Sequence, residues 1–68
     1  MAVTKIIELV GSSTTSSDDA VQDALNEARR TLRNIRALDV VSVGLRGADL
    51  AEWRAHVRVS FLIERVQE

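Results

Sequence analysis

The feature that most constrains this chain is a single amphipathic helix, predicted over residues 17–36. Its apolar residues follow a 4-3-4-3 spacing, which places them on one stripe of a helix. The stripe consists of Val21, Leu25, Ala28, Leu32 and Ile35, widened by Ala20 and Ala24. Ser16 is the expected N-cap, with Asp19 three residues later as in a capping box. One helix with one apolar stripe needs a partner surface, and the rest of the chain must supply it.

Three other segments are typical of strands. Residues 3–10 are rich in residues that favour strands, and apolar side chains occur at both odd- and even-numbered positions. This pattern predicts a strand that is covered on both faces. Residues 37–45 predict a second strand, in which Gly44 marks a bulge or a close backbone approach. Residues 52–63 predict a third strand, because two sets of side chains alternate along them. One set is predicted to pack on the helix (Trp53, Ala55, Val57, Val59, Phe61), and the other to face solvent or another subunit (Arg54, His56, Arg58, Ser60, Leu62).

This order predicts one α+β domain over residues 1–68, with β-α-β-β topology. The last two strands form a hairpin whose turn is expected at Gly47-Ala48-Asp49. The serine- and threonine-rich segment 11–17 is interpreted as a turn and helix cap. A phosphate-cradling loop is the lesser alternative, because the segment has one glycine and lacks the Gly-Lys-Ser/Thr ending.

Composition excludes several functional classes. The chain has 68 residues, no cysteine, one histidine and a net charge of −1. Disulfides and thiolate metal sites are excluded, and a near-neutral charge argues against a nucleic acid partner. We expect no membrane span and no signal peptide, hence a cytoplasmic location. No carboxylate pair or nucleophile is placed by spacing to work with His56, so the chain is not expected to be an enzyme. A chain this small often gains stability by oligomerising.

The sequence resembles the dodecins over nearly its whole length. The resemblance is carried by Lys-Ile-Ile-Glu-Leu-Val-Gly-Ser-Ser at 5–13, Ala-Arg-Arg-Thr-Leu-Arg-Asn-Ile at 28–35, and Val-Arg-Val-Ser-Phe at 57–61. It implies a three-stranded antiparallel sheet partly wrapped around one helix, and a hollow homododecamer. It also implies a non-catalytic activity, the sequestration of riboflavin or its nucleotides between a tryptophan after the helix and a glutamine on the third strand.

The chain departs from this family pattern at both ligand positions. The tryptophan aligns with Ala37 and the glutamine with Arg54, while Leu62 replaces a residue that is often basic. The hairpin is about two residues shorter than usual, which leaves the alignment around Gly44 and Arg46 open. Stacking on an aromatic side chain contributes about 1–3 kcal/mol per ring, so these replacements predict weak or lost flavin binding. Trp53, next to Arg54, is expected on the opposite face of the strand in a structural role.

The resemblance offers two further ligands. Some dodecins hold coenzyme A, and the matching positions here include Lys5, Thr31 and Arg33; intersubunit salt bridges are the competing interpretation. A flavin-poor branch includes a calcium-binding dodecin, and this chain looks closer to that branch. The possible oxygen donors are Asp18, Asp19, Asp23, Asp39, Asp49 and Glu52, none in an EF-hand spacing.

Three hypotheses follow. The first is a dodecin-like storage or sequestration shell whose flavin pocket is altered at Ala37, Arg54 and Arg46. The second is a riboflavin- or FMN-binding dodecin with an unusual pocket. The third is a calcium-binding dodecin. In all three the partner is a second copy of this chain, with neither nucleic acid nor membrane involved.

Overall fold

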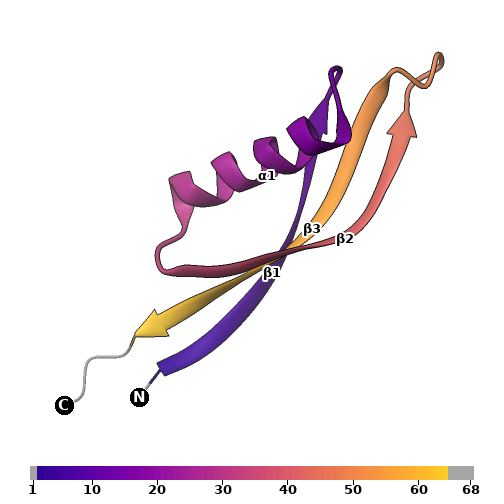
Figure 1. The fold of residues 1–68 in the computed structure, drawn as a ribbon. Helices are drawn as coiled ribbons and strands as arrows, with labels where there is room; N and C mark the ends of the chain where they lie inside the picture. Colours follow the sequence, from indigo (N-terminus) through magenta and orange to yellow (C-terminus); the bar gives the residue numbers. More distant parts are fainter. Residues whose placement is uncertain (1, 65–68) are drawn as a thin grey trace.

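The chain forms one helix on one face of a three-stranded sheet (Figure 1). The computed structural model describes residues 2–64. The elements are β1 (Ala2–Ser13), α1 (Ser17–Thr31), β2 (Ile35–Arg46) and β3 (Glu52–Glu64). β3 lies between the other two strands, and both pairings are antiparallel. The predicted β-α-β-β order and α+β class are therefore confirmed.

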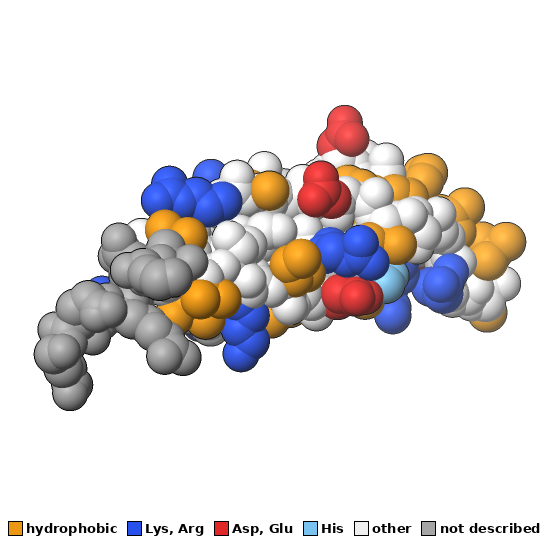
Figure 2. Space-filling model, turned by 90° about the horizontal axis from the view of Figure 1, so that it is seen from below, with side chains coloured by type: hydrophobic (Ala, Val, Ile, Leu, Met, Phe, Trp, Pro, Cys, Tyr) orange, Lys and Arg blue, Asp and Glu red, His pale blue; other side chains and the backbone are white. Residues whose placement is uncertain are grey.

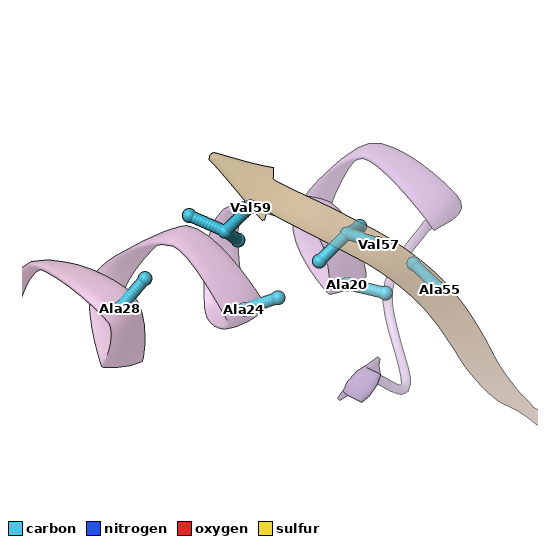
Figure 3. Packing of buried hydrophobic residues seen from close by; sticks show 6 residues of the cluster. All are labelled: Ala20, Ala24, Ala28, Ala55, Val57 and Val59. Atoms are coloured by element: carbon cyan, nitrogen blue, oxygen red, sulfur yellow. The ribbon is translucent and has the colours of Figure 1, made fainter. Parts of the chain in front are cut away.

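The core lies between α1 and the middle of β3 (Figure 3). The buried hydrophobic residues of the described chain are small: Ala20, Ala24 and Ala28 from α1, and Ala55, Val57 and Val59 from β3. Because three alanines face the sheet, the helix approaches the strands closely. The predicted alternation of β3 is confirmed, and Trp53 packs against this core at its edge.

The helix ends earlier than its apolar pattern predicts. Ser16 is the N-cap, as expected, and its Oγ accepts a hydrogen bond from the Asp19 amide at 3.0 Å. The last helical residue is Thr31, so the predicted end at residue 36 is wrong. Leu32 already has extended backbone angles (φ −118°, ψ 151°), and Asn34 has a positive φ of 61°. No helix among residues 2–64 is long and apolar enough to cross a membrane.

β2 carries two irregularities, and neither lies at Gly44. The pairing register with β3 shifts between Ile35 and Ala37 and again between Val40 and Ser42. Gly44 itself pairs regularly with Arg54, so the predicted bulge there is wrong. The turn at Gly47-Ala48-Asp49 is confirmed by a 3.1 Å hydrogen bond from the Leu50 amide to the Gly47 carbonyl.

The sheet face opposite α1 is not covered by any of residues 2–64, and we call it the open face. Its residues pair across the three strands: Ile6, Glu8, Val10, Ala37, Asp39, Ser42, Gly44, Arg46, Arg54, His56, Arg58 and Ser60. Ile6 is 54% exposed and Val10 59%, so the prediction that the first strand is covered on both faces is wrong for a single chain. Figure 2 views the molecule from this side and shows acidic and basic side chains together near its middle, further basic side chains toward both ends, and hydrophobic side chains between them.

Candidate functional site

A pocket opens on the open face near the β2–β3 hairpin. Its volume is about 460 Å³, within the range of small-molecule sites. It is lined by Val10, Ser42, Val43, Gly44, Arg46, Arg54 and His56. The strands bring them together because Gly44 pairs with Arg54, and Ser42 and Val10 both pair with His56. The pocket thus contains two predicted ligand positions, Arg46 and Arg54.

The third predicted position, Ala37, lies elsewhere on the same face. It pairs with Ser60, which is six positions along β3 from Arg54. At about 3.3 Å per residue this separation is about 20 Å. One planar ring cannot contact both residues of the same chain. A site that uses both Ala37 and Arg54 therefore needs two subunits.

The basic side chains of the pocket differ in their partners. The Arg54 Nε donates a hydrogen bond to Glu52 Oε2, and His56 Nε2 contacts Glu8 Oε1. Glu8 also lies 3.9 Å from the Arg58 guanidinium. Arg46 donates to the neighbouring Leu45 carbonyl at 2.9 Å and makes no ion pair among the described residues. Glu52, the cross-strand partner of Arg46, directs its carboxylate to Arg54 instead.

Sequence reasoning missed the contact between His56 and Glu8. The alternation of the third strand placed His56 on the correct face. What it lacked was the register of β1 against β3, which pairs Val10 with His56 and Glu8 with Arg58. Opposite charges at Glu8 and Arg58 were the available signal, because cross-strand charge pairs favour one register.

The aromatic side chains of the protein lie away from the pocket. The chain has one tryptophan, one phenylalanine and no tyrosine. Trp53 pairs with Leu45 and packs against the core. Phe61 lies eight residues further along β3, an even number, so its side chain leaves the same face of the strand. Both therefore belong to the face that α1 covers. The open face, which carries Ala37 and Arg54, offers no Trp, Tyr or Phe ring on which a flavin could stack.

The predicted coenzyme A positions lie at the other end of the molecule. Lys5 pairs with Phe61, which also pairs with Ile35 at the start of β2. Asn34 accepts a 3.0 Å hydrogen bond from the Leu62 amide, which holds the segment after Arg33 at the same end. The Thr31 hydroxyl donates to the Glu27 carbonyl at 3.4 Å. The fold brings these positions to one end, distant from the pocket.

The acidic residues considered as calcium ligands are spread over the fold. Several have local partners: Asp19 accepts from the Ser13 hydroxyl, Asp23 from the Ser12 amide, Asp49 from the Ala51 amide, and Glu52 from Arg54. Asp18 lies in the first turn of α1, and Asp39 pairs with Arg58 on the open face. No group of three or more acidic, histidine or cysteine side chains among the described residues is arranged to hold a metal ion.

The fold defines a small β-α-β-β subunit with one open sheet face, and comparison with known proteins places it in a family. The family model described as Dodecin matches residues 3–64, so the chain belongs to the dodecins. A search of the curated proteins finds no match. Family membership implies a homododecamer, in keeping with the resemblance that the sequence shows.

Solved structures agree with this assignment. A Thermus thermophilus protein is 34% identical, with 97% of this chain and 100% of that chain covered and a TM-score of 0.85. Streptomyces davaonensis dodecin is 27% identical over 94% and 97% of the two chains, with a TM-score of 0.86. The calcium dodecin of Mycobacterium tuberculosis is 28% identical over 97% of each chain, with a TM-score of 0.81. The predicted dodecin fold is thereby confirmed.

Proposed function

We propose that this protein forms a hollow homododecamer that sequesters a small ligand without catalysis, and that its affinity for flavin is weak. The dodecin fold supports the assembly. The open face supports the ligand, because in a single chain it exposes both a pocket and large apolar side chains such as Ile6 and Val10. A second copy that covers this face would enclose the pocket.

The proposal of weak flavin affinity rests on one observation: the open face has no aromatic side chain on which a flavin could stack. Ala37 stands on the open face where the resemblance expects a tryptophan, and the rings of Trp53 and Phe61 belong to the opposite face. Arg54 stands in place of the glutamine, and a guanidinium donates hydrogen bonds but accepts none. A stacked pair of flavins would lose an aromatic contact on two sides, at about 1–3 kcal/mol each.

The test combines mass measurement with flavin titration. Light scattering should give the mass of a dodecamer, and the protein purified from cells should be colourless. Riboflavin fluorescence should be quenched far less by the natural chain than by the double variant Ala37→Trp with Arg54→Gln. The expected difference in affinity is about a hundredfold, because every 1.4 kcal/mol changes an affinity tenfold. Ala37→Leu with Arg54→Gln is the matched control, which changes size without adding a ring.

Three results would contradict the proposal. A mass equal to that of a single chain would contradict the proposed dodecamer. Submicromolar quenching of riboflavin by the natural chain would favour the alternative of a flavin-binding dodecin with an unusual pocket. A double variant that does not bind riboflavin would show that the missing tryptophan and glutamine do not account for the weak binding of the natural chain.

A calcium-binding dodecin is the other alternative, and it is favoured by the likeness to the calcium dodecin of Mycobacterium tuberculosis. Calcium needs six to eight oxygen ligands, so donors from several copies would have to meet in the assembly. Isothermal titration of the assembled protein with calcium is the direct measurement. Heat of binding, together with a thermal midpoint that falls when a chelator is added, would establish this function.

A further inference from the structure

The middle of the open face holds the one histidine of the chain in contact with a carboxylate. His56 Nε2 lies 2.5 Å from Glu8 Oε1. Because a carboxylate only accepts hydrogen bonds, Nε2 carries the hydrogen and donates it. We propose that this pair makes the contact between copies proton-sensitive: when a second copy covers the open face, each subunit takes up a proton at His56 Nδ1. This inference rests on the proposed function, because it assigns a regulation to the assembly proposed above.

Glu8 lies between apolar side chains that a partner surface would cover. Its neighbours on the same face of β1 are Ile6 and Val10, which are 54% and 59% exposed. The occupant is a second copy of this chain, because the chain belongs to the dodecins and the charges of the face balance. Together with Glu52, the open face carries three carboxylates and three guanidinium groups: Glu8, Asp39, Glu52, Arg46, Arg54 and Arg58.

The middle of the open face has more carboxylates than guanidinium groups. Arg58 pairs with Glu8 on β1 and with Asp39 on β2, so one arginine faces two acids. Its guanidinium lies 3.9 Å from Glu8, further away than the imidazole of His56. α1 packs on the other face of the sheet (Figure 1). These four side chains therefore carry balanced charges only when the imidazole is protonated.

The charges at the hairpin end oppose a proton on His56, and Glu52 reduces their effect. Arg54 lies two residues from His56 on β3, and its Nε donates to Glu52 Oε2. Glu52 also pairs across the strands with Arg46, so one carboxylate faces two guanidinium groups at this end. Glu8 has the larger effect on the imidazole, because its carboxylate is in direct contact with the ring.

Cover by a second copy strengthens the effect of Glu8. In a single chain the side chain of Glu8 is 51% exposed and that of His56 36% exposed, so water still solvates both. A carboxylate that is removed from water needs a compensating charge, which a protonated imidazole supplies at the shortest distance. The assembled state should therefore bind the proton more tightly than separate chains do. This stabilisation should be present near pH 6 and be lost toward pH 8, as histidine loses its proton.

Urea titration of the assembled protein at about pH 6, 7 and 8 tests the proposal, with light scattering as the measure of dissociation. Urea is uncharged and therefore does not screen the ion pairs. For the natural chain the urea midpoint should fall as the pH rises, because the association constant changes by up to about tenfold per pH unit for each proton taken up. His56→Gln should remove this dependence, since the chain has no other histidine. It keeps the chain's amino terminus, which also titrates near pH 8.

Two further variants locate the effect. Glu8→Gln removes the charge beside the imidazole and should flatten the pH dependence although the histidine remains. Glu27→Gln is the matched control: Glu27 is an exposed glutamate that pairs with Arg30 on α1 at 3.3 Å. Removal of its charge should leave the pH dependence of the natural chain unchanged. Circular dichroism verifies that each variant is folded before the titration.

Three outcomes overturn the inference: a midpoint of the natural chain that stays level or rises between about pH 6 and 8, a dependence that His56→Gln retains, or equal flattening by Glu8→Gln and Glu27→Gln. If His56→Gln does not fold, the natural chain and Glu8→Gln still decide. All three outcomes leave the proposed function standing, because an assembly that is insensitive to pH can still sequester a ligand. The mass of a single chain at every pH would overturn both the proposed function and this inference.

Discussion

At the scale of single residues, Gly11 fixes how closely α1 can lie on the sheet. It is buried in β1, and a Cβ built on it would lie 2.1 Å from the Ala20 carbonyl oxygen and 2.8 Å from the Ala24 amide nitrogen. Both atoms belong to the helix backbone, which cannot turn aside as a side chain does. The sequence pattern assigns the same glycine to the start of a turn and helix cap. Its actual role is to permit contact between two backbones.

We expect Gly11→Ala to destabilise the protein, because the helix must move away from β1 to admit one methyl group. Overpacking of this kind costs about 1–3 kcal/mol. Gly44→Ala is the matched control: its methyl group would meet only the mobile end of Arg46, so its cost should stay within about 0.5 kcal/mol. Denaturant unfolding at one fixed protein concentration measures both. Equal stability losses would show that the helix does not need this contact.

At the scale of elements, the helix shows where sequence patterns succeed and where they fail. The spacing of apolar residues correctly identified the buried alanines, and the pair of Ser16 and Asp19 correctly identified the N-cap. It failed at the other end because Leu32 and Ile35 do pack against the core, but from extended backbone beyond Thr31. A pattern of apolar residues predicts which side chains contact the core. It does not predict whether the backbone that carries them is helical or extended. Asn34, a residue that tolerates a positive φ, was the available signal for the helix stop.

The N-cap gives a second prediction at this scale. Ser16→Ala removes the acceptor for the Asp19 amide and should lower the free energy of unfolding by about 1 kcal/mol. Ser17→Ala changes the same atoms one residue later, inside the helix, where serine caps nothing. Its effect should be small, since alanine is the better helix former. Thermal unfolding followed by circular dichroism compares the two variants; a larger loss for Ser17→Ala would contradict the assignment of the cap.

The pairing of strands explains why the site could be predicted only in part. Alternation along the third strand placed Trp53 and Arg54 on opposite faces, and this is confirmed. Alternation within one strand does not give register between strands. The distance between Ala37 and Arg54, the pocket shared by Arg54 and Arg46, and the contact of Glu8 with His56 all depend on register. The shift between Val40 and Ser42 moves that register midway along β2, and no residue in the sequence marked it.

At the scale of the whole molecule, the single chain has a small core and a large exposed apolar surface. The largest fully buried side chains among the described residues are Val57 and Val59. Within residues 2–64, eight large apolar side chains are exposed instead: Val3, Ile6, Val10, Val40, Val41, Val43, Leu45 and Leu50. The 15-residue helix is about 22 Å long, whereas the molecule extends over 55 Å. We therefore expect copies of this chain to bury these apolar side chains against one another.

This imbalance predicts that the subunit does not remain folded alone. Unfolding and dissociation should occur together, and the denaturation midpoint should rise with protein concentration, because assembly stabilises only the folded state. Circular dichroism and light scattering, recorded across the same guanidinium titration at two protein concentrations, measure both events. The two transitions should coincide at each concentration and shift together between them. A folded species of 7.5 kDa that persists after the assembly has dissociated would show that the small alanine and valine core suffices by itself.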